Sequence, residues 1–507
     1  MPRNVQAERS TSLWMPVPDI PGRPVEDSRP CDLVVIGAGM AGLSVAYEAL
    51  LKGRQVTVLD RGAIASGMTA RTTAHLASAL DDFYHEFISL RGEEEARQLH
   101  DSLAAAIDRI EEISRQEAID CDFTRCDGYL FLGEGDKIDL LEREIDACHR
   151  IGFLDVSWAD RAPMPSFETG RCLRFPDQAR FHPLKYLQGL ARAILAKGGV
   201  LRPHTAVESV SQTGSEVAVK TANGQTIMAR DVVAATNSPI VGPLPLHTKQ
   251  APYRTYAMAF AVAKGAITDA LYWDTLDAYH YVRLQEGDAN DFLIVGGEDH
   301  KTGEADNALG RFGSLEAWAR RHFAPAGEET HRWSGQVLEP VDFAGFVGRH
   351  PSDDHIYLVT GDSGQGITNG ALAGLLIPAL MEDGDHLWRK LYDPGRTTLK
   401  AAGSFVSENM TAAKSMAEHL GGPLLPSEDK LGPGEGGLIG GGINPIAAYR
   451  DENGTLYRLS SNCSHMGCTV HFNSFERCWD CPCHGSHFAT DGEAINAPAT
   501  GSLKRAE

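Results

Sequence analysis

One stretch near the front of the chain decides its fold: Cys31-Asp32-Leu33-Val34-Val35-Ile36-Gly37-Ala38-Gly39-Met40-Ala41-Gly42. A β-branched strand pattern over Cys31–Ile36 runs directly into a G-x-G-x-x-G turn and an apolar helix pattern over Met40–Leu51. Gly37 permits the tight turn, Gly39 lets a pyrophosphate approach the backbone, and Gly42 lets helix and strand pack closely. The helix N-terminus offers free N–H groups and a favourable dipole to phosphates. We therefore predict a Rossmann-like dinucleotide-binding unit here.

Residues further along support the same prediction. Residues 55–59 have the pattern of the next strand, and Asp60 ends it where a carboxylate can accept hydrogen bonds from ribose hydroxyls. Residues 66–73 follow with small side chains and hydroxyls. Much later, residues 359–368 join a strand to a helix and could bring backbone N–H groups to a flavin ring. A purely structural glycine turn is the alternative, and the motif alone does not separate FAD from NAD.

The bulk properties indicate a globular protein of several structural units. Its 507 residues exceed the size of one core, and hydrophobic and charged contents of 42% and 23% are ordinary. A formal net charge of −21 argues against nucleic acid or an anionic membrane as a partner. No apolar run has the length of a membrane span, and the first 32 residues lack the apolar segment of a secretory signal. We expect no integral membrane segment and a cytoplasmic location.

Further strand and helix patterns follow the nucleotide-binding unit, and a linker-like stretch comes after them. Residues 207–235 alternate between apolar and polar, as in half-buried strands. Another strand is expected over Ile356–Thr360, with a helix over residues 370–381. Residues 421–442, rich in Gly, Pro and Glu, have the composition of a linker that enters a new domain.

With these features the sequence resembles the D-amino-acid oxidase-like family of FAD enzymes, which includes glycine oxidase and gamma-glutamylputrescine oxidase. The resemblance covers about residues 30–395. It rests on the front fingerprint, residues 232–237, residues 342–349 before the second glycine turn, and His182-Pro183 at a helix start. It implies a Rossmann-like α/β FAD domain interleaved with an α+β substrate domain whose sheet roofs the flavin. It also implies oxidation of a C–N bond by hydride transfer from the carbon next to nitrogen.

The resemblance also implies how FAD is held. Some family members bind flavin covalently through a cysteine in the C-terminal half of the FAD enzyme, but this chain has no cysteine between Leu173 and Asn462. Others use a histidine near the position of Arg71, which is not a histidine. We therefore expect non-covalent FAD. The residues expected to contact it are Gly37, Gly39, Met40, Ala41, Gly42, Asp60, Arg61, Thr69, Ala70, Thr72, Thr73, Val207, Gly361, Gly364, Gln365, Gly366, Ile367 and Thr368.

The substrate site departs from the glycine oxidase branch. In that branch an arginine two residues after a glycine holds the substrate carboxylate, and counting from Gly335 this position holds Val337. An amine or an N-substituted amino acid is therefore favoured over a simple amino acid. The sequence identifies no catalytic residue, because Tyr253, Arg254 and His300, the candidate pocket residues, have ordinary structural explanations.

The cysteines are concentrated at the back of the chain, where five of the ten fall within 21 residues: Cys463, Cys468, Cys478, Cys481 and Cys483. They belong to two boxes, C-S-H-M-G-C at 463–468 and C-P-C-H-G-S at 481–486. A Cys₂His₂ zinc site is the alternative, but zinc ligand pairs are usually spaced C-x₂₋₄-C and H-x₃₋₅-H. The dipeptides Asn453-Gly454 and Asp491-Gly492 predict β-hairpins in the same region.

The two boxes closely resemble those of Rieske proteins, in which two thiolates bind one iron and two imidazoles bind the other. The resemblance assigns Cys463 and Cys481 as thiolate ligands and His465 and His484 as imidazole ligands. It also implies a disulfide between Cys468 and Cys483 that ties the two loops together. Reduced thiols are the alternative for this last pair, because disulfides are unusual in the cytosol.

The surroundings of the boxes bear on the reduction potential. Ser486 matches a serine that donates to a bridging sulfide in high-potential Rieske proteins, whereas Phe488 stands where those proteins have a tyrosine donating to a cysteine sulfur. Hydrogen bonds to sulfur raise the potential by stabilising the reduced cluster. We predict a potential in the middle of the roughly −150 to +300 mV Rieske range. Cys478 has no assigned role and fits a structural thiol.

The predicted organisation is an N-terminal extension (1–30), an FAD-dependent oxidoreductase domain (31–395), a linker (396–425) and an all-β Rieske domain (426–507). In the leading hypothesis a small amine-type substrate reduces FAD, and the cluster passes electrons singly to an unknown acceptor, either a protein, a quinone or oxygen. One alternative is an electron-transfer module fed by NAD(P)H, which a missing second dinucleotide fingerprint weakens. Another is a ring-hydroxylating oxygenase, which needs a large iron domain after the cluster, whereas only 23 residues follow His484.

Overall fold

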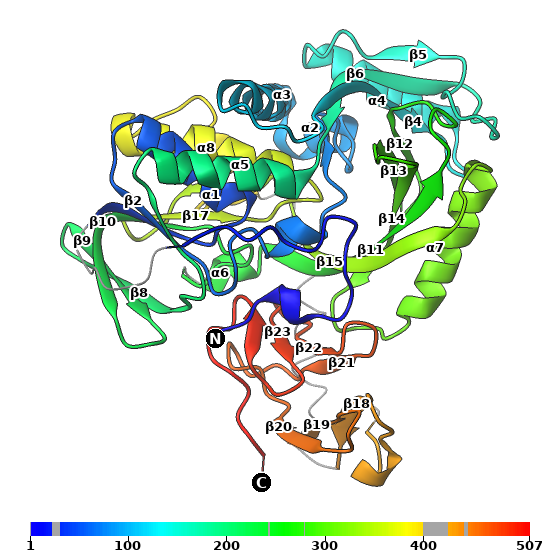
Figure 1. Ribbon diagram of the computed structural model, residues 1–507. Coiled ribbons are helices and arrows are strands. Elements are labelled where there is room, and N and C mark those ends of the chain that lie inside the picture. The colour runs from blue at the N-terminus through cyan, green and yellow to red at the C-terminus, as the bar shows by residue number, and fades with distance from the viewer. Residues whose placement is uncertain are drawn as a thin grey trace.

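The computed structural model describes residues 2–22, 31–241, 244–277, 279–398, 424–440 and 445–506. Two large sheets form an upper body, and a smaller all-β domain lies beneath them (Figure 1). The predicted linker at 396–425 falls mostly outside the described residues. At its far end, Leu425 already bridges to Ile439, so the small domain has begun by this point.

The first sheet is the predicted nucleotide-binding sheet. Its strands follow the order β16-β17-β10-β1-β2-β7, and all neighbours pair in parallel except β16 with β17. The strands are β1 (Cys31–Ile36), β2 (Val56–Leu59), β7 (Val200–Arg202), β10 (Thr226–Ala234), β16 (Phe346–Arg349) and β17 (Ile356–Thr360). The β1 residues Val34 and Val35 are fully buried, as expected for a parallel strand covered on both faces.

The alternating stretch predicted over 207–235 folds as three strands. The hairpin β8 (Val207–Thr213) and β9 (Glu216–Thr221) pairs with the first half of β10, and the second half of β10 joins the parallel sheet beside β1. Buried and exposed residues therefore alternate only at the edge of the sheet, where one face of the strands meets solvent. The apolar run at Val232–Ala234 belongs to the buried centre.

Helices cover the first sheet, and one of them, α8 (Gly366–Asp383), follows directly on the glycine turn after β17. The others include α1 (Met40–Leu51), α3 (Glu93–Gln116) and α5 (Pro183–Ala196). A Cβ added at Gly374 of α8 would stand 2.9 Å from the Ser44 Cβ of α1, so these two helices pack in close contact. The helix predicted over 370–381 starts earlier, at Gly366, because the left-handed residues Ser363 and Gly364 complete the turn before it.

The second sheet forms the substrate module. Its path is β15-β11-β14-β13-β12-β4-β6-β3, with β5 paired to β6. The strands are β3 (His75–Leu76), β4 (Thr124–Phe131), β5 (Ser157–Ala159), β6 (Cys172–Arg180), β11 (Gln250–Val262), β12 (Leu271–Asp274), β13 (His280–Gln285), β14 (Asp291–Lys301) and β15 (Glu329–Pro340). Its helices are α2 (Tyr84–Arg91), α4 (Ile138–Arg150) and α7 (Ala308–His322), with the short α6 (Leu244–His247) and α9 (Arg389–Tyr392) elsewhere in the body.

The small domain consists of two antiparallel sheets. One contains β18 (Gly436–Ile439), β19 (Ile446–Arg450) and β20 (Leu456–Ser460). The other contains β21 (His471–Asn473), β22 (Cys478–Asp480), β23 (His487–Ala489) and β24 (Ala494–Asn496). Both predicted hairpins are confirmed, since β19 pairs with β20 around Asn453-Gly454 and β23 pairs with β24 around Asp491-Gly492.

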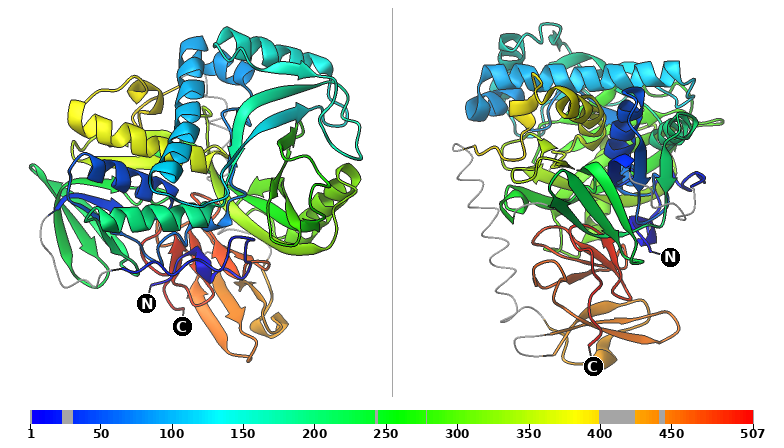
Figure 2. Two further views of the ribbon diagram at one scale, coloured as in Figure 1. Left: turned by 45° about the horizontal axis from the view of Figure 1, so that its top comes forward. Right: turned by 90° about the vertical axis from the view of Figure 1, so that its left-hand side faces the viewer.

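The N-terminal segment does more than extend the chain. Residues 2–22 run between the upper body and the small domain, as two views show (Figures 1 and 2). Trp14 is 3% exposed, and its indole donates to the Thr72 carbonyl of the upper body. Arg9 N donates to the Glu476 carbonyl of the small domain. The segment thus contacts both bodies and joins them.

Candidate functional site

The glycine fingerprint adopts the geometry that its sequence predicts. Gly37 has a φ of +103°, and a Cβ there would overlap the Ala235 carbonyl oxygen. A Cβ at Gly42 would overlap the carbonyl of Gly37, so only glycine lets α1 pack this closely on β1. The only heavy atom near a Cβ added at Gly39 would be Thr69 Oγ1 at 3.1 Å. The cradle is therefore open at Gly39, where a pyrophosphate needs room, and filled by backbone at the other two glycines.

A cavity of about 300 Å³ opens from this cradle and runs under the second sheet. Of the residues predicted to contact FAD, all except Gly42 and Ala70 line it. Asp60, at the end of β2, accepts hydrogen bonds from the N–H of Ala38 (2.7 Å) and of Gly62 (2.8 Å), and burial raises its pKa. The turn at residues 361–368 also lines the cavity. Glycine backbone, an acidic strand end and a helix N-terminus thus fit a bound dinucleotide.

The roof of the cavity comes from the substrate module and carries carboxylates and aromatic rings. Asp81 accepts a hydrogen bond from the Tyr279 hydroxyl at 2.8 Å, and it lies directly against Gly364 of the turn. Tyr281, Trp273 and Asp299 also line the space. Desolvation by the surrounding protein raises the pKa of Asp81 and of Asp299 to about 6.

Two more carboxylates stand behind Asp81 and share one hydroxyl. Ser363 Oγ lies 3.1 Å from Asp82 Oδ2 and 3.2 Å from Glu339 Oε2. Desolvation raises the pKa of both carboxyls, and the nearby acids add to this effect. We call Asp81, Asp82, Asp299 and Glu339 the acidic wall. No sequence signal marks this group, because its members lie far apart in the chain and carry no motif.

The candidate pocket residues named from the sequence lie elsewhere. None of Tyr253, Arg254 and His300 lines the cavity, whereas Val337, at the place of the expected arginine, does. Among the described residues, the arginines that line the cavity are Arg61 and Arg71, and both bond away from it. Arg61 donates to the Ala494 carbonyl of the small domain, and Arg71 pairs with Glu476 at 3.2 Å.

The four residues predicted as cluster ligands come together in two pairs. The thiols of Cys463 and Cys481 are in hydrogen-bonding contact, which lowers the pKa of Cys463 and raises that of Cys481. The rings of His465 and His484 lie 5.1 Å apart, centre to centre. His484 Nδ1 is buried and has no hydrogen-bond partner in the described part of the chain. Paired thiols, paired imidazoles and an orphaned ring nitrogen fit a [2Fe–2S] cluster with two sulfur and two nitrogen ligands.

The backbone around the two sulfurs fits the same cluster. The amides of His465 and Met466 point at Cys463 Sγ, and those of Cys483 and His484 point at Cys481 Sγ. The Ser486 hydroxyl also contacts Cys463 Sγ. These donors stabilise negative charge on sulfur, so the two loops are prepared for thiolate ligands.

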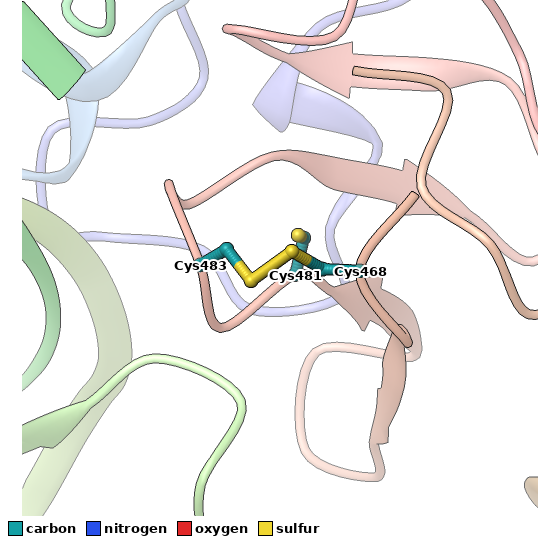
Figure 3. A group of neighbouring side chains, drawn as sticks. All are labelled: Cys468, Cys481 and Cys483. Atoms are coloured by element: carbon teal, nitrogen blue, oxygen red, sulfur yellow. A yellow bond between two sulfur atoms is a disulfide. The ribbon is translucent and has the colours of Figure 1, made fainter. Parts of the chain in front are cut away.

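A disulfide ties the two loops, as predicted. It joins Cys468 to Cys483, and the Cys481 sulfur lies beside it (Figure 3). The three sulfurs are close enough together to resemble a metal site. Because Cys468 and Cys483 are bonded to each other, only Cys481 of this group is available as a thiolate ligand.

A buried set of charges joins the small domain to the upper body. Glu8 lies 3.3 Å from Arg71 and 3.4 Å from Arg254, and Arg254 Nη2 donates to Asp480 at 2.7 Å. His487 Nδ1 faces Glu8 at 2.8 Å, and its Nε2 faces the Gln336 side-chain oxygen at 2.6 Å. We call Glu8, Arg71, Arg254, Glu476, Asp480 and His487 the ionic junction. The junction thus brings three carboxylates together with two arginines and one imidazole.

The junction places the small domain against the cavity. Ile495, Asn496 and Ala497 of the small domain line it. Asn496 Nδ2 donates to the Gly485 carbonyl at 3.2 Å, next to the ligand His484. Gln336, which also lines the cavity, donates to the same carbonyl at 3.1 Å. The predicted flavin site and cluster loop therefore share two bridging side chains.

Both parts of the chain match known protein families. Residues 32–380 match the family model described as FAD dependent oxidoreductase, and residues 425–507 match the Rieske [2Fe-2S] domain. YhfW of Bacillus subtilis (strain 168), named as a Rieske 2Fe-2S iron-sulfur protein, is 28% identical over 505 residues, which is 98% of each chain. Gamma-glutamylputrescine oxidoreductase of Escherichia coli (strain K12) is 28% identical over 381 residues, 70% of this chain and 85% of the relative.

A solved structure agrees with the fold of the larger part. Glycine oxidase from Geobacillus kaustophilus superposes with a TM-score of 0.62 at 17% identity, covering 73% of this chain and 99% of that one. At this identity the likeness concerns the fold alone. Within the described residues, no helix has both the length and the apolar character to cross a membrane.

Proposed function

We propose that this chain, which belongs to the FAD dependent oxidoreductase family and carries a Rieske [2Fe-2S] domain, oxidises the C–N bond of a cationic amine. The electrons then leave through the cluster to an external acceptor. The observation that carries the proposal is the acidic wall, of which Asp81 and Asp299 line the cavity. Amino acid oxidases and an oxidoreductase named for an amine substrate among the similar proteins support the reaction class.

The charge of the cavity favours an amine over an amino acid. A substrate carboxylate needs a free cation, and both lining arginines are engaged with the small domain. A substrate ammonium group needs a carboxylate, and Asp81 and Asp299 offer two beside the aromatic rings of Tyr279 and Trp273. Carboxylates bind ammonium groups through charge-assisted hydrogen bonds, and aromatic faces attract cations.

Asp81 is the side chain best placed to act on the amine. It lies against the turn at Gly364 and is held by the Tyr279 hydroxyl. Its pKa of about 6 lets it bind the ammonium as a carboxylate at neutral pH and accept the proton that leaves nitrogen. The ammonium nitrogen loses one proton and the carbon loses a hydride, so the product is a protonated imine, which water hydrolyses to a carbonyl compound and an ammonium ion. Bound FAD supplies the hydride acceptor, and the cluster supplies a one-electron carrier.

The remaining residues hold the cofactors in place. The N–H groups at the start of α1 would hold the pyrophosphate, Asp60 the ribose, and the turn at 361–368 the flavin ring. We also propose that the binding is non-covalent. Cys463, Cys481, His465 and His484 would hold the cluster. Free buried thiols at Cys121, Cys148 and Cys172 support a reducing, cytoplasmic compartment.

Anaerobic reduction of the flavin tests the proposal. The purified holoprotein is mixed with mono- and diamines, N-methyl amino acids, simple α-amino acids, NADH and NADPH, and the flavin absorbance is followed. We expect bleaching by cationic amines, followed by the electron paramagnetic resonance (EPR) signal of a reduced Rieske cluster. Fast bleaching by NADH or NADPH alone would instead establish an electron-transfer module. Bleaching only by α-amino acids would contradict the substrate class.

A further inference from the structure

Three imidazole rings meet where the upper body touches the Rieske loops. The His247 ring, at the end of α6, lies 4.9 Å from the His465 ring and 5.4 Å from the His484 ring, centre to centre. The two ligand rings lie 5.1 Å from each other. His247 is 7% exposed, so it fills the space between the ligand rings and the upper body.

The backbone next to these rings is fixed by close contacts. A Cβ added at Gly485, the residue after His484, would stand 2.6 Å from Gln336 Nε2 and 2.8 Å from Pro252 Cβ. At the other side of the loop, a Cβ at Gly303 would stand 3.1 Å from the Pro482 ring. The loop that carries His484 therefore lies directly on β11, β15 and the turn after β14. Nothing larger than glycine fits between them without a shift.

His247 belongs to the part of the upper body that also faces the cavity. Three residues later, Gln250 begins β11, and its side chain hydrogen-bonds Thr360 at 3.1 Å. Thr360 lines the cavity at the turn proposed to hold the flavin. The residue that covers the ligand imidazoles is thus joined, through one short segment, to the flavin site.

We propose that His247 is a positioning residue that seals the imidazole edge of the Rieske cluster, making this edge an internal junction of the chain. An open imidazole edge would let a redox partner dock directly on the ligand rings. Here the upper body already occupies that face, so an external acceptor must approach the cluster from another side. The proposal depends on the Rieske domain and does not depend on amine oxidation.

Covering the edge also changes the medium around the cluster. Reduction adds negative charge to the cluster, and water stabilises that charge better than protein side chains do. His465 and His484 are part-buried, and the His247 ring covers one side of them, so less water reaches the ligand imidazoles while His247 is in place. Removing the ring should therefore raise the reduction potential, even where the protein fold and the four ligands are unchanged.

The test compares His247→Ala, His247→Phe and His386→Ala in the full-length holoprotein, where His386 is a histidine after α8, outside the cluster site. Diethyl pyrocarbonate labels accessible imidazoles, and mass spectrometry reads the labelling of His465 and His484 in the oxidised protein. We expect both ligands to be protected in the wild type and in the control. In His247→Ala they should react about tenfold faster or more, because the covering ring is gone. The Phe variant keeps a ring of similar size and should keep the protection.

Dithionite-reduced samples give a second readout that needs no substrate. We expect the potential of His247→Ala to shift upward and its EPR g-values to change, with the control unchanged in both. If the wild-type ligands label as fast as exposed histidines, or if His247→Ala alters neither labelling, potential nor EPR spectrum, the proposal is wrong. If His247→Ala loses its cluster, the labelling of the Phe variant still decides. Failure of every amine to bleach the flavin would affect only the proposed function.

Discussion

Two groups of carboxylates lie on opposite sides of β11 and β15, and they behave in opposite ways. In the ionic junction, arginines face Glu8 and Asp480, and the pKa of each carboxyl falls below its usual range. In the acidic wall the pKa values of the carboxyls rise, because desolvation outweighs the hydrogen bonds and charges that oppose it. Among the described residues no arginine or lysine forms an ion pair with the wall.

The difference shows how the same side-chain type serves two purposes. Desolvation penalises every carboxylate, and only a nearby cation offsets the penalty. In the junction the protein supplies its own cations, so the charges hold two domains and an N-terminal segment together. In the wall the cation is missing, so a cationic ligand would complete the arrangement. The junction is therefore structural, and the wall is available for binding.

The largest effect is expected on breaking the junction. Arg254→Met removes the arginine partner of Asp480 at 2.7 Å and one of the two arginines beside Glu8, which keeps Arg71 at 3.3 Å. Removing one partner of a buried pair costs about 3–5 kcal/mol. Hydrogen exchange and limited proteolysis should show the small domain released at lower denaturant concentration. Arg320→Met, at the exposed pair with Glu316, is the control, and equal stability of the two variants would show that the junction does not hold the domains.

Removing a carboxylate of the acidic wall should lower kcat/KM without lowering the stability of the protein. Asp81→Asn removes the proposed ammonium ligand, and a hydrogen bond to a charged group contributes roughly 1.5–3 kcal/mol, so kcat/KM for a cationic amine should fall about 10- to 100-fold. Unfolding should occur at the same or a higher temperature, because a desolvated carboxylate is gone. Asp354→Asn, on the exposed surface, should change neither. A stability loss in Asp81→Asn as large as that of Arg254→Met would erase the distinction between the two groups.

The pH dependence of activity should follow the ionisation of the carboxyl groups in the acidic wall. Asp81 and Asp299 have pKa values of about 6, so the fraction of binding-competent carboxylate grows as the pH rises from 5 to 7. For an amine that stays protonated over this range, kcat/KM should rise with pH and level off above 7. In Asp81→Asn the rise should be much weaker. A flat profile in the wild type would argue against carboxylate binding.

The pH dependence of stability should have opposite signs in the two regions. The raised folded-state pKa of Asp81 means that its favourable contribution is present below the unfolded pKa of roughly 4 and is lost as pH rises through 6. The lowered pKa of Glu8 means that its contribution is present above roughly pH 4 and is lost as pH falls. Unfolding temperatures measure the two signs, with Asp81→Asn compared with the wild type from about pH 4 to 7 and Glu8→Gln compared with the wild type from about pH 5 down to 2.5. Curves of the same sign would contradict the assignment.

The smallest effect is expected at the edge of the same N-terminal segment. Arg3 pairs with Asp491 and Glu493 of the small domain, but its side chain is 42% exposed. Exposed ion pairs contribute about 0–1 kcal/mol, so Arg3→Ala should barely change the unfolding temperature. A loss comparable to that of Arg254→Met would mean that the segment is held by its surface charges and not by the buried junction.

The parts that local sequence predicted well are those in which a short motif carries its own geometry. The dinucleotide turn depends on three glycines within six residues, and the Rieske loops depend on two six-residue boxes. Each expectation needed only neighbouring residues, because backbone conformation and ligand spacing are set over one turn of chain. Both hairpins were confirmed for the same reason, and the structure also contains the disulfide that the Rieske resemblance implied. The sequence predicts the start of this helix at residue 370, whereas α8 begins at Gly366, because the apolar pattern begins only after the turn.

The sequence by itself therefore determined that this protein has a dinucleotide cradle and Rieske-type cluster loops. Only the tertiary structure decided how they are used. Glu8 meets residues 71, 254 and 487, Asp81 meets Tyr279, and His247 covers His465 and His484. These contacts join segments that lie far apart in the chain, and no local pattern marks them. Their energies depend on burial and on facing charges, which exist only once the domains have packed together.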